Sequence, residues 1–132
     1  AVLMRLARTP WPLPVKGLHA KRSLLSRANL ASAVLHAITA PHVASGTYLV
    51  ADDEALKVAE ILDALRQGLG RAPGMFSVPQ GPVKLALKAL GREGDLDRLF
   101  GDLCVSTGAL RATGWRAQVP VRAGLAAAIR VA

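Results

Sequence analysis

The residues around Arg22 have the types and spacing to hold an anion. A basic pair, Lys21 and Arg22, leads into a short apolar run at 23–26, and a helical pattern opens soon after it. An arginine on such a strand can hold a phosphate or carboxylate beside packed structure, because its guanidinium group stays charged and donates hydrogen bonds in a fixed plane. A solvated surface arginine is the alternative interpretation, and the residue types alone fit both.

The sequence does not contain a complete set of catalytic residues at a recognisable spacing. The single tyrosine, Tyr48, is followed four residues later by Asp52, so the Tyr-x-x-x-Lys pair of short-chain dehydrogenases does not occur. The glycine-rich run at 68–74 follows a helical pattern, whereas a phosphate-binding glycine loop follows a strand and opens a helix. We therefore expect a helix-ending glycine at position 68 or 70. Whether the chain takes part in an enzyme stays open, but alone it lacks a catalytic pair and a cofactor site.

Metal-ligating residues are also poorly placed. The three histidines have no metal-ligand spacing. The acidic run at 52–54 could suggest a divalent metal, but three consecutive side chains project in different directions. We interpret this run as the acidic entrance of the helix that follows, where carboxylates complement the helix dipole.

Length and composition limit the types of protein to which this chain can belong. The chain has 132 residues, of which 52% are hydrophobic, which is enough for one folded domain. Arg5 and Arg8 interrupt the early apolar residues, so no signal peptide is predicted, and no apolar run is long enough to span a membrane. The lone cysteine, Cys104, excludes an internal disulfide and fits a reducing compartment. We expect a cytoplasmic protein with no membrane partner, and a buried, unreactive Cys104.

Charge is unevenly distributed along the chain. The net charge is +8, and no acid occurs before Asp52, so the segment up to that point carries +6. Such a segment attracts anions, including nucleic acid, phosphorylated metabolites and acidic protein surfaces. A small basic binding module for nucleic acid or an acidic partner is therefore one functional alternative. Nucleic acid is the weaker partner, because aromatic residues do not alternate with the basic ones.

Hydrophobic spacing predicts short strands that alternate with helices. The strands are expected at 23–26, 47–50, 75–78 and 102–105. The helices are expected at 1–9, 29–40, 58–69, 82–90, 107–113 and 121–131, with a short helix or turn at 95–100. The fold class is thus α/β, with short strands and about five to six helices. Trp11 and Trp115 are expected to be packing anchors.

The helix at 29–40 has the clearest pattern. Asn29 is a good N-cap residue, and Pro41 closes the helix. Its apolar residues recur at the spacing of one buried face, which is formed by Leu30, Ala33, Val34, Ala37 and Ile38.

Several segments together resemble the C-terminal part of an NAD-dependent epimerase/dehydratase, in the extended short-chain dehydrogenase/reductase family that includes UDP-glucose 4-epimerase. The run at 11–14 resembles the family's "PLP" loop. The runs at 21–25 and 29–33 resemble its arginine-led strand and "(D/N)LxxA" helix, and 46–52 resembles its "G-x-x-Y/F-x-V-x-D" strand. The stretch from 106 to 125 resembles its closing "SKAxxxLGW…EGL" segment.

This resemblance implies a substrate-binding lobe spanning residues 1–132. Arg22 and Arg98 would contact the diphosphate of a nucleotide-sugar, a UDP-sugar by the likeness, and Leu13 and Pro14 would belong to the substrate site. The NAD-binding Rossmann domain and the catalytic tyrosine and lysine would lie upstream, so NAD is implied for a longer parent only. A lone lobe would expose apolar surface along 47–50 and the helix at 29–40, and we expect it to self-associate.

Overall fold

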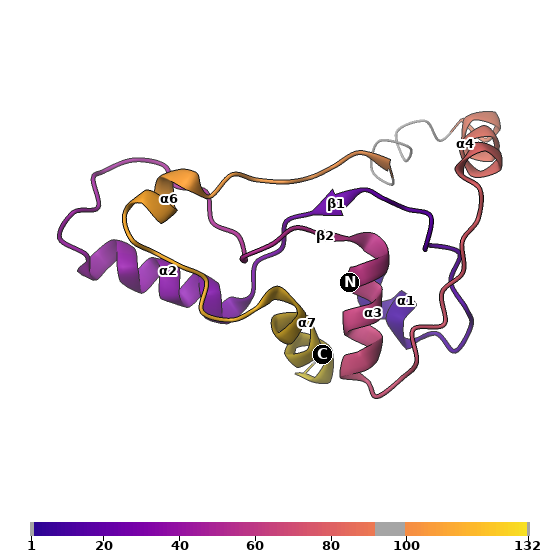
Figure 1. Ribbon diagram of the computed structural model, residues 1–132, viewed down its shortest axis with the longest axis horizontal. Coiled ribbons are helices and arrows are strands. Elements are labelled where there is room, and N and C mark those ends of the chain that lie inside the picture. Colours follow the sequence, from indigo (N-terminus) through magenta and orange to yellow (C-terminus); the bar gives the residue numbers. More distant parts are fainter. Residues whose placement is uncertain (1, 92–99, 132) are drawn as a thin grey trace.

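The computed structural model describes residues 2–91 and 100–131, which form a helix-rich α/β arrangement (Figure 1). The elements, in chain order, are α1 Val2–Arg8, β1 Lys21–Arg22, α2 Arg27–Thr39, β2 Leu56–Lys57, α3 Val58–Gly68, α4 Gln80–Ala89, α6 Gly108–Ala112 and α7 Val121–Val131. None of the helices in the described ranges is long and apolar enough to cross a membrane.

A small sheet lies at the centre of the molecule (Figure 1). Strand β1 pairs with β2 in antiparallel register, with Arg22 opposite Leu56. On its other side, Arg22 forms a parallel bridge with Leu103. The amide of Leu103 donates to the carbonyl of Lys21 at 2.8 Å, and the amide of Ser23 donates to the carbonyl of Leu103 at 2.9 Å. Arg22 is therefore held between two neighbouring extended segments.

The main core lies where α1, α3 and α7 pack together, beside β2. Helix α3 contributes three large and fully buried side chains, Ile61, Leu62 and Leu65. The predicted helix at 58–69 is confirmed, although it ends one residue earlier, at Gly68. Helix α7 has the predicted bounds, and its Val121 and Ile129 are each 1% exposed.

A second, smaller core lies between α2 and α6. It contains Ala33, Leu110 and Trp115, with Tyr48 and Val50 packed against it. The indole Nε1 of Trp115 donates to the hydroxyl of Ser32 at 2.9 Å. The prediction that Trp115 is a packing anchor is therefore confirmed. The same prediction is wrong for Trp11, which is 74% exposed. The proline-rich segment around Trp11 runs along the surface, which keeps its side chain in solvent.

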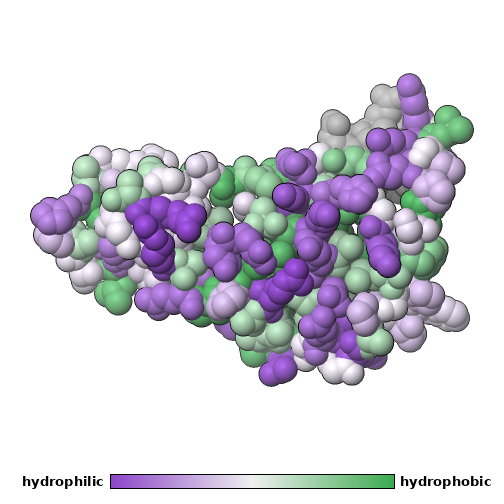
Figure 2. Space-filling model, viewed as in Figure 1, coloured by the Kyte–Doolittle hydropathy of each residue, from purple (hydrophilic) through white to green (hydrophobic). Residues whose placement is uncertain are grey.

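The apolar face of α2 points outward, which corrects the predicted buried stripe. Only Ala33 of the predicted face is buried, whereas Leu30, Val34 and Ile38 are 43%, 51% and 77% exposed. The helix packs inward through smaller and polar residues. Hydrophobic residues accordingly reach the surface at the two ends of the molecule, around α2 and around α4 (Figure 2).

All four predicted strands are wrong or reduced. Residues 23–26 and 47–50 are extended but not assigned to a strand, and the observed strand β1 lies two residues earlier. Residues 75–78 and 102–105 keep one paired residue each, at Met75 and Leu103. A strand needs a partner, and in the described part of the chain only β1 and β2 form a two-stranded sheet. The short helix or turn expected at 95–100 falls mostly outside the described residues.

The cap of α2 is also different from the prediction. Ser26 is the N-cap residue, and its hydroxyl accepts from the amide of Asn29 at 3.2 Å. Asn29 lies inside the first turn and is fully buried. The predicted helix-ending glycine at position 68 or 70 is confirmed at Gly70, which has a φ of 70°. Gly91 and Gly114 follow helices in the same way, with φ values of 66° and 97°, which glycine adopts without strain.

Candidate functional site

Arg22 lies at the central sheet with its guanidinium group against the chain near Gly101. Its Nη1 donates to the carbonyl oxygen of Gly101, and to that of Lys21 at 3.3 Å. The amide of Lys21 donates to the Asp102 carboxylate at 2.7 Å, which holds the two segments together. The guanidinium plane is thus fixed by its surroundings rather than swinging in solvent. A fixed plane of donors is what recognition of a diphosphate requires.

The other predicted site residues lie in different surroundings. Leu13 is 9% exposed and belongs to the main core, where it bridges Met75 in parallel fashion. Pro14, the next residue, is exposed. Arg98 lies outside the described residues, although Gly101, which contacts Arg22, is close to it in sequence. Arg22 and Leu13 therefore lie in two separate places: Arg22 pairs with Leu56 and Leu103, and Leu13 pairs with Met75.

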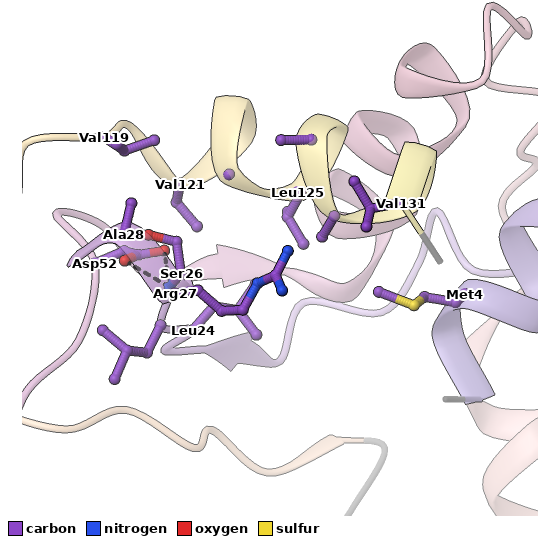
Figure 3. Close-up of a pocket in the computed structure, with 14 residues that line it drawn as sticks. Met4, Leu24, Ser26, Arg27, Ala28, Asp52, Val119, Val121, Leu125 and Val131 are labelled. Atoms are coloured by element: carbon purple, nitrogen blue, oxygen red, sulfur yellow. Dashed lines mark hydrogen bonds between the residues drawn. The ribbon is translucent and has the colours of Figure 1, made fainter. Parts of the chain in front are cut away.

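A groove of about 780 Å³ runs between α7, α1 and the joint that precedes α2. Its walls are mostly apolar, and they include Met4, Leu24, Leu125 and Val131. Figure 3 shows the side chain of Arg27 reaching into this groove toward α7. The volume is within the range of small-molecule sites, and the single guanidinium would favour a ligand that carries an anionic group.

A buried polar network lies at the end of this groove. The side-chain Nδ2 of Asn29 donates to the Asp52 carboxylate at 2.7 Å and to the carbonyl of Val119 at 2.8 Å. Its side-chain oxygen accepts from the amides of Gln118 and Val119, both at 2.9 Å. The Asp52 carboxylate also accepts from the amide of Ser26, at 3.0 Å. Asn29 therefore fixes the joint between β1 and α2 against the chain that enters α7.

The acidic run at 52–54 caps helices, but not the one predicted. The Asp53 carboxylate accepts from the amide of Val121 at 3.1 Å, at the start of α7. Glu54 pairs with Arg122 of the same helix at 3.7 Å. Helix α3, the expected recipient, begins instead with the amide of Lys57 donating to Glu60 at 2.8 Å. Carboxylates favour the N-terminus of whichever helix lies near them in space, and neighbourhood in sequence does not determine which one.

Arg66, in α3, is a buried charged residue that the sequence pattern did not single out. It is 3% exposed, and its guanidinium group donates to backbone carbonyls of the proline-rich segment and of the glycine-rich turn. A signal was present in the sequence, because Arg66 follows Leu62 by four residues and so lies on the buried side of α3.

The structure also places the potential metal ligands and the thiol of the described residues. No group of three or more His, Cys, Asp and Glu side chains among them could hold a metal ion. Cys104 is exposed rather than buried, which corrects its prediction. Its segment pairs through one residue only and lies at the surface.

Comparison with known proteins identifies one informative relative. The chain is 34% identical to the UDP-glucose 4-epimerase of Vibrio cholerae over 118 residues, which are 88% of this chain and 36% of that protein. The chain thus spans about a third of the length of the relative that it matches. No family model matches it, and no solved structure matches it significantly. The resemblance seen in the sequence is therefore confirmed: the chain is related to UDP-glucose 4-epimerase, and the match is consistent with a C-terminal part of an epimerase.

Proposed function

We propose that this chain is the substrate-binding lobe of an NAD-dependent nucleotide-sugar epimerase or dehydratase of the extended short-chain dehydrogenase/reductase family. In this role Arg22 contacts the diphosphate of a UDP-sugar, with Arg98 as a second contact. The observation that carries the proposal is the 34% identity, over most of the chain, to a protein named UDP-glucose 4-epimerase.

The surroundings of Arg22 support this role chemically. Diphosphate carries several oxygens that accept paired hydrogen bonds, and a guanidinium group presents paired donors and a permanent charge. The backbone carbonyls of Gly101 and Lys21 already orient this group, so little rotamer freedom is left to lose on binding. The net charge of +8 attracts polyanionic ligands toward the molecule.

NAD would be held elsewhere in such an enzyme. The glycine-rich turn after α3 has Gly70 and Gly74 at φ values of 70° and 52°, and it leads into an extended segment rather than a helix. These residues do not fit the strand-to-helix loop that binds a dinucleotide pyrophosphate. The proposal therefore assigns NAD and the Tyr-x-x-x-Lys pair to a separate Rossmann domain.

The outer face of α2 is where that domain would pack. Leu30, Val34 and Ile38 form a continuous exposed stripe, and the adjacent extended segment at 47–50 includes Leu49, which is 53% exposed. An apolar stripe beside an extended segment can be covered by a neighbouring sheet and its side chains. In the absence of that domain, the same surface would drive self-association of the chain.

Calorimetric titration of the 132-residue chain with UDP tests the role of Arg22. We expect binding of UDP, weaker binding of uridine, and a loss of affinity of about tenfold or more in Arg22→Ala, because charge-assisted hydrogen bonds are lost. Arg22→Lys keeps the charge and should recover only part of the affinity. Lys21→Ala, which removes the neighbouring exposed cation, is the matched control and should change the affinity less than about twofold. Equal UDP affinities in the Arg22 and Lys21 variants would refute the assignment.

A salt titration separates this function from the basic-module alternative. A module that neutralises phosphates through its acid-free first segment would bind mixed-sequence oligonucleotides with an affinity that falls steeply as salt rises. The structure distributes the basic residues of this segment over α1, the turn at 14–17, β1 and the start of α2. We expect UDP binding to exceed oligonucleotide binding at physiological salt, and the reverse order would favour the alternative.

A further inference from the structure

The buried guanidinium group of Arg66 joins two segments that are far apart in the sequence. Nη1 donates to the carbonyl oxygens of Pro73 at 2.6 Å and Gly74 at 3.1 Å. Nη2 donates to the carbonyl oxygens of Trp11 at 2.8 Å and Thr9 at 3.3 Å. One side chain thus holds the proline-rich segment at 9–14 against the turn at 70–74.

This arrangement is unusual for an arginine, because no carboxylate in the described part of the chain pairs with the group. Burial of a charge is unfavourable unless hydrogen bonds compensate it, and here carbonyl dipoles provide the compensation. Its Nε atom is buried with no hydrogen-bond partner among the described residues. An aliphatic residue would be the ordinary choice for a position on the inner side of α3, so the four bonds are the reason for an arginine there.

The proline-rich segment needs a donor from outside. Pro10, Pro12 and Pro14 have no amide hydrogen, so the segment cannot form regular hydrogen bonds along its own backbone. The carbonyls of Thr9 and Trp11 face the interior, where an unpaired acceptor is unfavourable. Arg66 provides both donors from a single rigid plane.

The two segments then pair through their backbones. The amide of Leu13 donates to the carbonyl of Gly74 at 3.0 Å, the amide of Phe76 donates to that of Leu13 at 3.0 Å, and the amide of Lys16 donates to that of Phe76 at 3.2 Å. The carbonyl of Gly74 is shared with Arg66. A Cβ atom at Gly74 would lie 2.8 Å from Nη1 of Arg66, and the φ value of 52° there also favours glycine.

We propose that Arg66 is a positioning residue for the substrate site, which fixes the segment containing Leu13 and Pro14 before the ligand arrives. This inference rests on the proposed function and on the family resemblance, which implies that Leu13 and Pro14 belong to the site that receives the nucleotide-sugar. A loop ordered in advance loses less entropy on binding, so its release lowers affinity without removing any direct contact.

Two measurements on Arg66→Ala and Arg66→Lys test the inference. Hydrogen exchange reports the order of the segment through the amides of Trp11, Leu13 and Lys16, and titration with UDP reports the binding. We expect faster exchange in this segment and about tenfold weaker UDP binding in Arg66→Ala. Lysine lacks the planar fork and can contact only one of the two segments, so Arg66→Lys should remain folded while the segment still exchanges faster.

Arg130→Ala is the matched control. Its Nε donates to the carbonyl of Gly68 at 3.1 Å, so this arginine also binds the end of α3, but from the side of α7. Its loss should leave both the exchange of the segment and the UDP affinity unchanged. Guanidinium ion at low millimolar concentration should restore UDP affinity to Arg66→Ala only, because only that variant has a cavity lined by carbonyls.

The outcomes are distinguishable. Unchanged exchange at 11–16 in both Arg66 variants would overturn the positioning role. Faster exchange with unchanged UDP affinity would overturn its link to binding. A wild-type chain that does not bind UDP would refute the proposed function and the binding half of the inference, and the exchange data would still decide whether Arg66 orders the segment.

Discussion

Asn29→Ala should destabilise the protein far more than the removal of an ordinary polar side chain. The Asn29 side chain is fully buried and forms four hydrogen bonds of 2.7–2.9 Å, two as donor and two as acceptor. Alanine leaves the amides of Gln118 and Val119 and the carbonyl of Val119 without these partners. Asp52 keeps its bonds from the amide of Ser26.

The magnitude follows from this count. Each buried group left unpaired costs about 1–3 kcal/mol, and partial entry of water at the nearby groove lowers the sum. We expect a loss of about 3–4 kcal/mol in the free energy of unfolding, a large share of the total stability of a domain of this size. Thermal and urea unfolding followed by circular dichroism would measure it.

Ser26→Ala is the control for this prediction. It removes one cap hydrogen bond at the same joint and should cost about 1 kcal/mol. A loss in Asn29→Ala no larger than that in Ser26→Ala would refute the reasoning that the asparagine holds the joint.

Two further predictions concern packing and surface. Gly68→Ala should destabilise by about 1–3 kcal/mol in urea unfolding despite its gain in helix propensity, because the new Cβ would lie 2.7 Å from Cγ2 of Ile129 and 2.8 Å from Cα of Ala126. Gly81→Ala in the first turn of α4 meets no atom within 4 Å and should be neutral or slightly stabilising; equal losses in the two variants would contradict the packing argument. Val34→Lys combined with Ile38→Lys should lower the sedimentation-derived mass at high concentration and change stability by less than about 0.5 kcal/mol, because both side chains are exposed. A wild-type chain that stays monomeric throughout would contradict self-association through α2.

Local signals in the sequence predicted the helices well. The bounds of α7 and the ends of α3 and α6 follow from hydrophobic spacing and from glycines that adopt positive φ, and these signals act within a few residues. Strands were predicted less well, because 47–50 has strand-forming residues but no described partner beside it. The pattern of α2 showed which face is apolar, but spacing cannot show whether anything covers that face.

The candidate site was only partly accessible from sequence. Arg22 could be singled out by its position before the α2 pattern, and the structure adds the backbone groups that orient it. Arg66 could not be singled out with the same ease, because its partners are carbonyls on segments whose approach depends on the folded chain. Asn29 was predicted to be the N-cap of α2, but it is a buried residue that bonds to distant segments. The neighbouring residues in the sequence are the same in both cases, so they cannot distinguish the two roles.

Helix α4 stands apart from the other helices in Figure 1, and this separation divides the molecule energetically. Leu85 and Leu90 are each 70% exposed, and the contacts of the helix include a bond from Gln80 to the carbonyl of Gly17 and Lys84 over the ring of Phe100 at 4.8 Å. Opening of this helix therefore re-exposes little apolar area from Leu85 and Leu90, which already lie mostly in solvent. Opening of α4 requires less free energy than global unfolding, so the helix would unfold and refold many times during the lifetime of the native core around α3.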